Sequence, residues 1–287
     1  MRKRSALWSL VILFVVFAAM IFLFAPLQLA FGLWGLALTE LGLLGMALAA
    51  AALLRYDFRS VFPLARPSLR ELSGVAVLWL GGFIVSMAVT CAILYLFPEG
   101  MAVGESLSEL FVSLPLPLAW VIVALLPAVC EEALHRGVML HTFSGFCSRW
   151  VVVLLMGLLF GLFHMDPVRF LTTTVLGMCL TYLMVERRNL ILPILFHLMN
   201  NTVSVLSSSV PVDPEAASAM PLETVGIMLI LSSAAIFLLR GGAALVQTPQ
   251  RREEKSGRAL LRGRLLSALL AVGLILLGSA LVAVSGG

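Results

Sequence analysis

Charged side chains are scarce in this sequence. Asp, Glu, Lys and Arg make up only 12% of its 287 residues, whereas hydrophobic residues make up 61% and the mean hydropathy is +1.08. In an ordinary soluble domain about a quarter of the residues are charged. So few polar residues could not cover the apolar surface of a soluble fold. The composition therefore excludes a soluble globular domain, a disordered chain and a disulfide scaffold.

Several motifs that carry a known chemistry are also missing. The chain has no H-E-x-x-H zinc motif, no G-x-S-x-G nucleophile elbow and no G-x-x-x-x-G-K-[ST] nucleotide loop. The four cysteines are scattered, without a C-x-x-C pair or the spacing of metal ligands, so we expect them to be apolar packing residues. The apolar run after Arg4 is too long for the ~7–15 residues of a signal-peptide core, which favours a retained first span.

The apolar residues form long blocks, each close to the ~20 residues that a helix needs to cross a bilayer. We therefore predict an all-α polytopic transmembrane helical bundle with about eight to nine spans. The candidate spans are residues 6–24, 29–54, 72–97, 116–143, 150–165, 170–185, 190–206, 222–239 and 265–284.

The basic residues predict the orientation of these spans. With a cytoplasmic N-terminus, only Arg169 lies in an outer loop and only Arg136 lies within a span. The other seventeen are then cytoplasmic, which is a strong positive-inside signal. This signal predicts that the C-terminus lies outside. The net charge of +4 then reflects the membrane topology rather than nucleic-acid binding. The seventeen are Arg2, Lys3, Arg4, Arg55, Arg59, Arg66, Arg70, Arg149, Arg187, Arg188, and seven from Arg240 to Arg264.

Ionisable residues inside the spans are the candidates for function, because each costs about 2.5–3.5 kcal/mol at the bilayer centre. They include all four histidines of the chain. For Glu40, alone in the second span, we favour a structural role in helix contact. The full set is Glu40, Glu131, Glu132, His135, Arg136, His141, His164 and His197.

The fourth span carries two adjacent carboxylates. Glu132 and Arg136 are four residues apart, so they can pair on one face of the helix. This pairing would leave Glu131 free to face a cavity. Pro127 removes a backbone hydrogen bond just before the two glutamates, which favours a kink or an opening there.

Two further pairs repeat the four-residue spacing. Phe160 and His164 lie near the end of the fifth span, and His197 and Asn201 share a face of the seventh. At 1.5 Å per residue, Glu131, His164 and His197 lie about 18, 21 and 10 Å from the inner ends of their helices. All three fall in the middle third of a ~30 Å hydrocarbon layer, which predicts a single site.

Two chemistries fit this set of residues. A glutamate in an apolar cavity can act as the general base for water, while His197 and Asn201 donate hydrogen bonds to an oxyanion. Alternatively, Glu131, His164 and His197 could ligate Zn²⁺ with an open fourth position. Both chemistries predict hydrolysis of an acyl bond within the membrane.

Three motifs, in order and on separate spans, resemble the signatures of the CPBP family of CAAX proteases and bacteriocin-processing enzymes. The resemblance covers about residues 111–206 and implies an intramembrane endopeptidase of the glutamate type, long also classed as a metalloprotease. It implies that Glu131 and His164 activate water, that His197 and Asn201 stabilise the oxyanion, and that Glu132 and Arg136 support the site. The motifs are Glu131-Glu132-x-x-x-Arg136, Phe160-x-x-x-His164 and His197-x-x-x-Asn201.

These observations divide the chain into three parts. Residues 1–110 hold three N-terminal spans, residues 111–206 a catalytic core of four spans, and residues 207–287 two spans with a basic cytoplasmic loop. The expected partners are the lipid bilayer and a membrane-associated peptide or protein substrate, for CAAX-type processing or for bacteriocin maturation and immunity. The alternative functions are a proton- or ion-coupled transporter and a non-catalytic immunity or scaffold protein.

Overall fold

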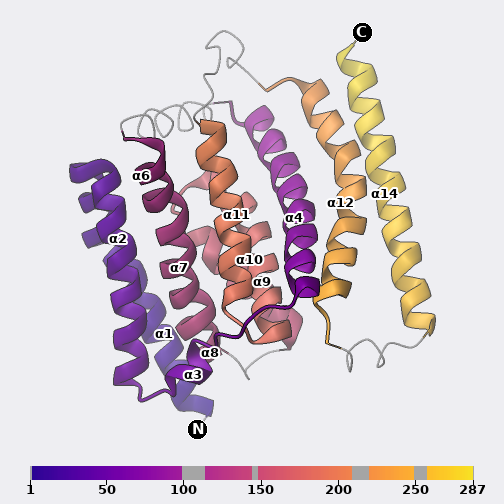
Figure 1. Ribbon diagram of the computed structural model, residues 1–287. Coiled ribbons are helices and arrows are strands. Elements are labelled where there is room, and N and C mark those ends of the chain that lie inside the picture. Colours follow the sequence, from indigo (N-terminus) through magenta and orange to yellow (C-terminus); the bar gives the residue numbers. More distant parts are fainter. Residues whose placement is uncertain (1, 99–113, 144–147, 209–219, 249–256, 287) are drawn as a thin grey trace.

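The computed structural model describes residues 2–98, 114–143, 148–208, 220–248 and 257–286, and these residues contain helices and no strand. The long helices stand side by side, with α1 (Arg2–Ala19) and α2 (Ala25–Leu53) at one edge and α14 (Gly257–Ser285) at the other (Figure 1). Many large apolar side chains are exposed, among them Leu265, Leu269 and Leu276 of α14. This outer surface suits lipid, and the predicted all-α polytopic bundle is confirmed.

Seven helical segments in the described residues are long and apolar enough to cross a membrane, compared with the eight to nine spans predicted. Part of the difference is the 47-residue segment Leu7–Leu53, which holds the first two predicted spans. Gly32, with φ 54° and ψ −129°, breaks the helical path inside it. Gln28 Nε2 then donates to Thr39 Oγ1 at 3.1 Å, eleven residues along the chain, so the chain folds back on itself here.

The rest of the difference is the fifth span. Its helix α9 (Arg149–Phe163) has only 15 residues, or about 22 Å at 1.5 Å per residue, which is short for a ~30 Å layer. His164 caps the helix, and Met165 takes a left-handed conformation with φ 50°. The Asp166 side chain then accepts hydrogen bonds from the first backbone N–H groups of α10 (Pro167–Arg187). The chain therefore reverses directly after His164.

The fourth predicted span is one composite helix. It runs through α6 (Leu116–Trp120), α7 (Leu126–Glu132) and α8 (Leu140–Phe143), joined by the wider π-helical stretches η2 (Val121–Leu125) and η3 (Ala133–Met139). Pro127 is the second residue after η2, and the two carboxylates directly precede η3. The candidate residues of this span thus lie between two distortions of the helix.

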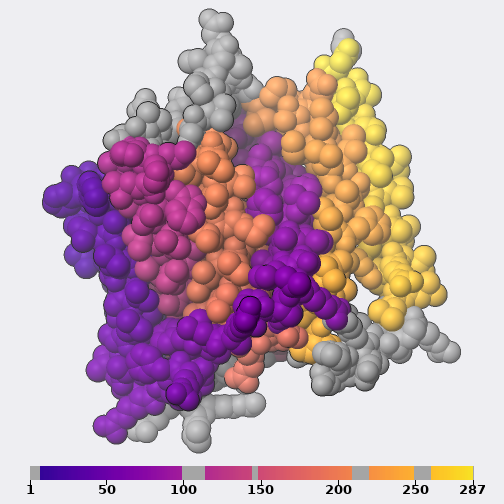
Figure 2. Space-filling view, viewed as in Figure 1, coloured from indigo at the N-terminus to yellow at the C-terminus, as the bar shows by residue number. Residues whose placement is uncertain are grey.

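A segment between α2 and α4 (Leu69–Leu96) ties several helices together at one end of the bundle. It contains the short α3 (Phe58–Val61) and crosses the lower face in Figure 2. Asn189, just before α11 (Ile191–Ser208), bonds both the N–H and the C=O of Ala65. At the start of α4, Glu71 pairs with Arg187 at 2.6 Å. The basic residues Arg55 to Arg70 lie at this end. Because Asn189 contacts Ala65 just before α11 begins, α11 starts at this end and finishes at the opposite end.

The remaining helix, α12 (Leu222–Val246), packs between α4 and α14. The predicted boundary at residues 110 and 111 lies outside the described residues.

Gly161 allows α9 and α10 to pack closely and so places His164. A Cβ atom there would collide with the Thr174 hydroxyl group and the Phe170 carbonyl of α10. We expect Gly161→Leu to destabilise the protein by about 1–3 kcal/mol or more, because backbone has to move. Thermal unfolding in detergent measures this. Gly45→Leu is the matched control, because no atom lies within 4 Å of a Cβ at Gly45, and an equal loss in both variants would contradict the prediction.

Candidate active site

A cavity of about 570 Å³ lies inside the bundle, between the second predicted span and the four spans of the predicted catalytic core. It is lined by side chains of α2, α4, α7, α9, α10 and α11. Four of the six predicted site residues line it: Glu131, His164, His197 and Asn201. The other two, Glu132 and Arg136, are fully buried behind His197.

Glu131 faces this cavity without a hydrogen-bond partner. The residue is only 8% exposed, and its Oε2 atom accepts no hydrogen bond from any described residue. Its nearest ionisable contact is His197, whose Nε2 atom lies 4.0 Å from Oε2. A buried carboxylate oxygen with no partner is costly, so its presence indicates a place for water or substrate.

Glu132 makes the contacts that Glu131 lacks. Its Oε1 atom accepts hydrogen bonds from Arg136 Nη1 at 2.7 Å and from His197 Nδ1 at 2.9 Å. Arg136 Nη2 also donates to the Gly177 carbonyl of α10 at 3.0 Å. Because a carboxylate paired with arginine only accepts, the proton of this histidine contact belongs to His197 Nδ1. Nε2 of His197 is thereby turned toward Glu131.

His164 is oriented by the backbone of its own helix. Its Nδ1 atom lies 2.8 Å from the Phe160 carbonyl, one turn earlier in α9. A carbonyl oxygen only accepts, so Nδ1 carries a proton and Nε2 of a neutral His164 keeps a lone pair for the cavity. The Phe160 ring packs edge-on against His164 and His197, at 5.0 and 5.7 Å between ring centres, and Arg136 lies 4.4 Å from its centre.

Asn201 reaches the composite helix at the point where Pro127 weakens it. Proline has no N–H group, so the Val123 carbonyl one turn earlier loses its usual helical donor. Asn201 Nδ2 donates to this carbonyl at 3.2 Å, and Oδ1 of Asn201 accepts from Asn200 Nδ2 at 3.3 Å. The proline thus fixes where the α11 amide sits, and the second N–H of that amide remains available.

The cavity opens at one end of the bundle. Ser204 and Ser207 in the last turns of α11 and Arg169 in the first turn of α10 are exposed and line it, together with the half-buried Gln28. This is the end opposite to the segment that carries Arg55 to Arg70 (Figure 1).

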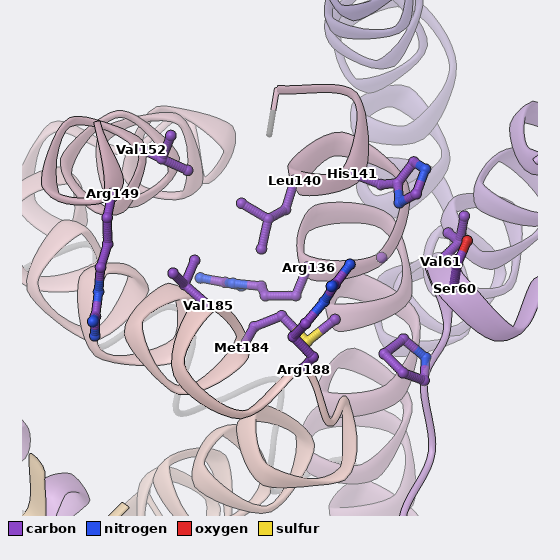
Figure 3. A pocket seen from close by; sticks show the side chains of 12 residues that line it. Ser60, Val61, Arg136, Leu140, His141, Arg149, Val152, Met184, Val185 and Arg188 are labelled. Atoms are coloured by element: carbon purple, nitrogen blue, oxygen red, sulfur yellow. The ribbon is translucent and has the colours of Figure 1, made fainter. Parts of the chain in front are cut away.

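A second pocket of about 340 Å³ lies at the other end, beneath Arg136 (Figure 3). Arg136, Arg149, Arg188 and His141 line it, and its lining includes no carboxylate. Arg149 pairs with Glu186 and lies 5.1 Å from the Tyr182 ring centre. Arg136 therefore lies between the cavity and this pocket. Its side chain lines the pocket, and its guanidinium group binds Glu132 behind the cavity wall.

The arrangement of these residues on α7, α9 and α11 agrees with a comparison of the sequence with protein families. The family model of the type II CAAX prenyl endopeptidase Rce1-like proteins matches residues 113–203. This segment of the chain is similar to the CPBP family. The match covers about a third of the chain, and the family consists of CAAX-type intramembrane proteases. No curated protein and no solved structure matches the chain.

A metal ion bound in this segment would need several ligand side chains grouped around it. In the described part of the chain, no three His, Cys, Asp or Glu side chains are grouped as ligands would be. Glu131, His164 and His197 share the cavity without such a grouping.

Glu40 and Asn200 were not among the site residues predicted from the sequence. Glu40, for which the sequence favoured a structural contact, lines the cavity with the motif residues, and so does Asn200. Glu40 lies on α2, outside the matched segment, and a lone carboxylate in an apolar span was the signal that pointed to it. The spacing of residues within one helix does not show which neighbouring helix that carboxylate faces.

The ion pair of Glu132 and Arg136 gives a stability prediction. Arg136→Met leaves the Glu132 charge buried without a cation, and we expect a loss of about 3–5 kcal/mol. The double variant with Glu132→Met removes both charges and should recover most of that loss. Unfolding in detergent measures both, and a double variant no more stable than Arg136→Met would contradict this account.

Proposed function

We propose that the chain is an intramembrane endopeptidase that hydrolyses peptide bonds of membrane-associated proteins or peptides. The observation that carries this proposal is the sharing of one cavity by an unpartnered Glu131 carboxylate and the free Nε2 of His164. Both groups can accept a proton, and both face the same polar space. A water molecule between them would be activated as a nucleophile.

In the first step, the Glu131 carboxylate takes a proton from this water while His164 Nε2 accepts its second hydrogen bond. The oxygen then attacks the carbonyl carbon of the peptide bond, and negative charge develops on the carbonyl oxygen. Two N–H donors on α11 support that oxyanion: Nδ2 of Asn201, and Nε2 of His197 when it is protonated. Glu131 finally gives its proton to the leaving amine, which returns the carboxylate to its starting state.

Glu132 and Arg136 act behind His197. The Glu132 carboxylate accepts from His197 Nδ1, so it holds the ring in place and balances the charge of a protonated imidazole. Arg136 pairs with Glu132 and connects it to α10 through the Gly177 carbonyl. These two residues thus stabilise the oxyanion-binding histidine without touching the substrate.

We expect Glu131→Gln to lower the rate of cleavage by about 10²- to 10⁴-fold, because the amide cannot take a proton from water. Proteoliposomes are incubated with quenched fluorescent single-span peptides, with and without a chelator. Glu223→Gln, an exposed change at the start of α12 away from the cavity, is the control.

Full activity of folded Glu131→Gln would overturn this assignment. Loss of wild-type cleavage with chelator would favour the zinc alternative. Flux of an ion or solute in sealed vesicles with no peptide product would favour a transporter. A phenotype that survives all the glutamate changes would favour an immunity or scaffold protein.

We further propose that the protein lies in the cell membrane with its N-terminus in the cytoplasm and its C-terminus outside. The uneven distribution of Lys and Arg supports this orientation. With it, the cavity mouth at Ser204 and Ser207 faces outward, so the expected substrates present their cleavage site at the outer half of the bilayer. Peptides being matured on export fit this geometry better than lipid-modified C-termini in the cytoplasmic leaflet.

Cysteine labelling tests the orientation independently of activity. Ser207→Cys at the mouth and Ser60→Cys at the other end are matched changes of exposed serines. In a background without the four native cysteines, a membrane-impermeant maleimide should label intact cells at position 207 and not at position 60. Labelling at position 60 alone would mean that the mouth faces the cytoplasm.

A further inference from the structure

Glu40 is a buried carboxylate with no cation beside it. It lies in the second half of α2, is 2% exposed, and its Oε2 atom has no hydrogen-bond partner among the described residues. Its neighbour Thr39 is already engaged, accepting from Gln28 Nε2 and donating to the Gly35 carbonyl at 2.9 Å. The local structure of α2 therefore gives Glu40 no partner.

The other ionisable groups of the cavity do not neutralise it either. Arg169 at the mouth pairs with Asp166 at 3.4 Å, and His197 bonds Glu132. Glu40 instead shares the cavity with a second carboxylate, that of Glu131. Helix α2 packs directly against α7, which brings the two carboxyl groups to one cavity.

A structural contact does not account for this arrangement. Leucine or glutamine would fill the same space at lower cost, because a buried carboxyl group without partners loses several kcal/mol of hydration. Two carboxylates facing one cavity also repel each other, and this repulsion is relieved when they hold one proton between them. Glu131 has to be ionised in order to accept a proton from water, so the shared proton belongs on Glu40.

We propose that Glu40 is a positioning residue of the peptidase site, whose neutral carboxyl group donates a hydrogen bond to Glu131, directly or through one cavity water. This inference rests on the proposed function. The bond fixes the orientation of the Glu131 carboxylate before water attacks. When Glu131 takes the proton of the water and passes it to the leaving amine, Glu40 keeps its own proton throughout, so the cycle balances. The site would then draw on a span outside the segment that the family model matches.

Three substitutions test whether Glu40 acts as a hydrogen-bond donor, as an ionised group or only by filling space. Glu40→Gln keeps a donor of nearly the same shape but cannot ionise, and it should retain most of the activity. Glu40→Leu keeps the bulk and removes the donor, and it should lower kcat about 10- to 100-fold with little change in KM. Glu223→Leu removes an exposed carboxylate away from the cavity and should have no effect.

Each outcome is read beside wild type and Glu131→Gln, with thermal unfolding of every variant. An active Glu40→Leu would overturn the proposal, and so would a Glu40→Gln variant as slow as the leucine variant, because Glu40 would then have to ionise. In the Glu131→Gln background, Glu40→Leu should cause no further loss, whereas an independent role would make the two losses add. Failure of the proposed function looks different, because wild type would cleave nothing or Glu131→Gln would stay active.

Discussion

The buried ion pair of Glu132 and Arg136 is the interaction on which the rest of this site depends. Two charges in the interior of a membrane bundle are stable only if each satisfies the other and the remaining donors find acceptors. Arg136 donates to Glu132 and to the Gly177 carbonyl, and Glu132 Oε1 also accepts from His197, whereas Arg136 Nε and Glu132 Oε2 have no partner among the described residues. One pair therefore joins the composite helix, α10 and α11.

The pair also gives the two adjacent glutamates different environments. Successive residues of a helix point about 100° apart, so only one of the two can share the face of Arg136. Glu132 takes that face and is buried completely, while Glu131 turns to the cavity with a free oxygen. The same side-chain type thus serves as a fixed acceptor in one position and faces the cavity with an unpaired oxygen in the next.

Distortions of the helices position the remaining groups. Pro127 exposes the carbonyl to which Asn201 donates, and the end of the short α9 leaves His164 inside the bundle rather than at its surface. Glycine at position 161 lets α10 return close enough to complete the wall. In each case a departure from regular helix packing positions a group of the site.

The sequence predicted much of this, because lipid imposes simple constraints. Span length and the scarcity of charge predicted the all-α bundle, and the four-residue spacing predicted the contact of Glu132 with Arg136, which the structure places at 2.7 Å. The sequence placed the first reversal between residues 24 and 29, whereas the structure places it at Gly32, inside the second predicted span, and α9 ends two residues before the end of the fifth predicted span. The place of Glu40 was not predicted either, since it depends on which helix packs beside α7.

The cavity mouth explains how a peptide could be cut where lipid offers no hydrogen bonds. A substrate helix has to unwind before its carbonyl can reach Glu131, and each backbone group freed in lipid costs several kcal/mol. The mouth is lined by hydroxyl groups of Ser204, Ser207, Thr172 and Thr173, which donate to carbonyls of their own helices. Their oxygen lone pairs remain to accept the N–H groups of an extended peptide. In the proposed peptidase, this surface would therefore supply the acceptors that the unwound substrate needs.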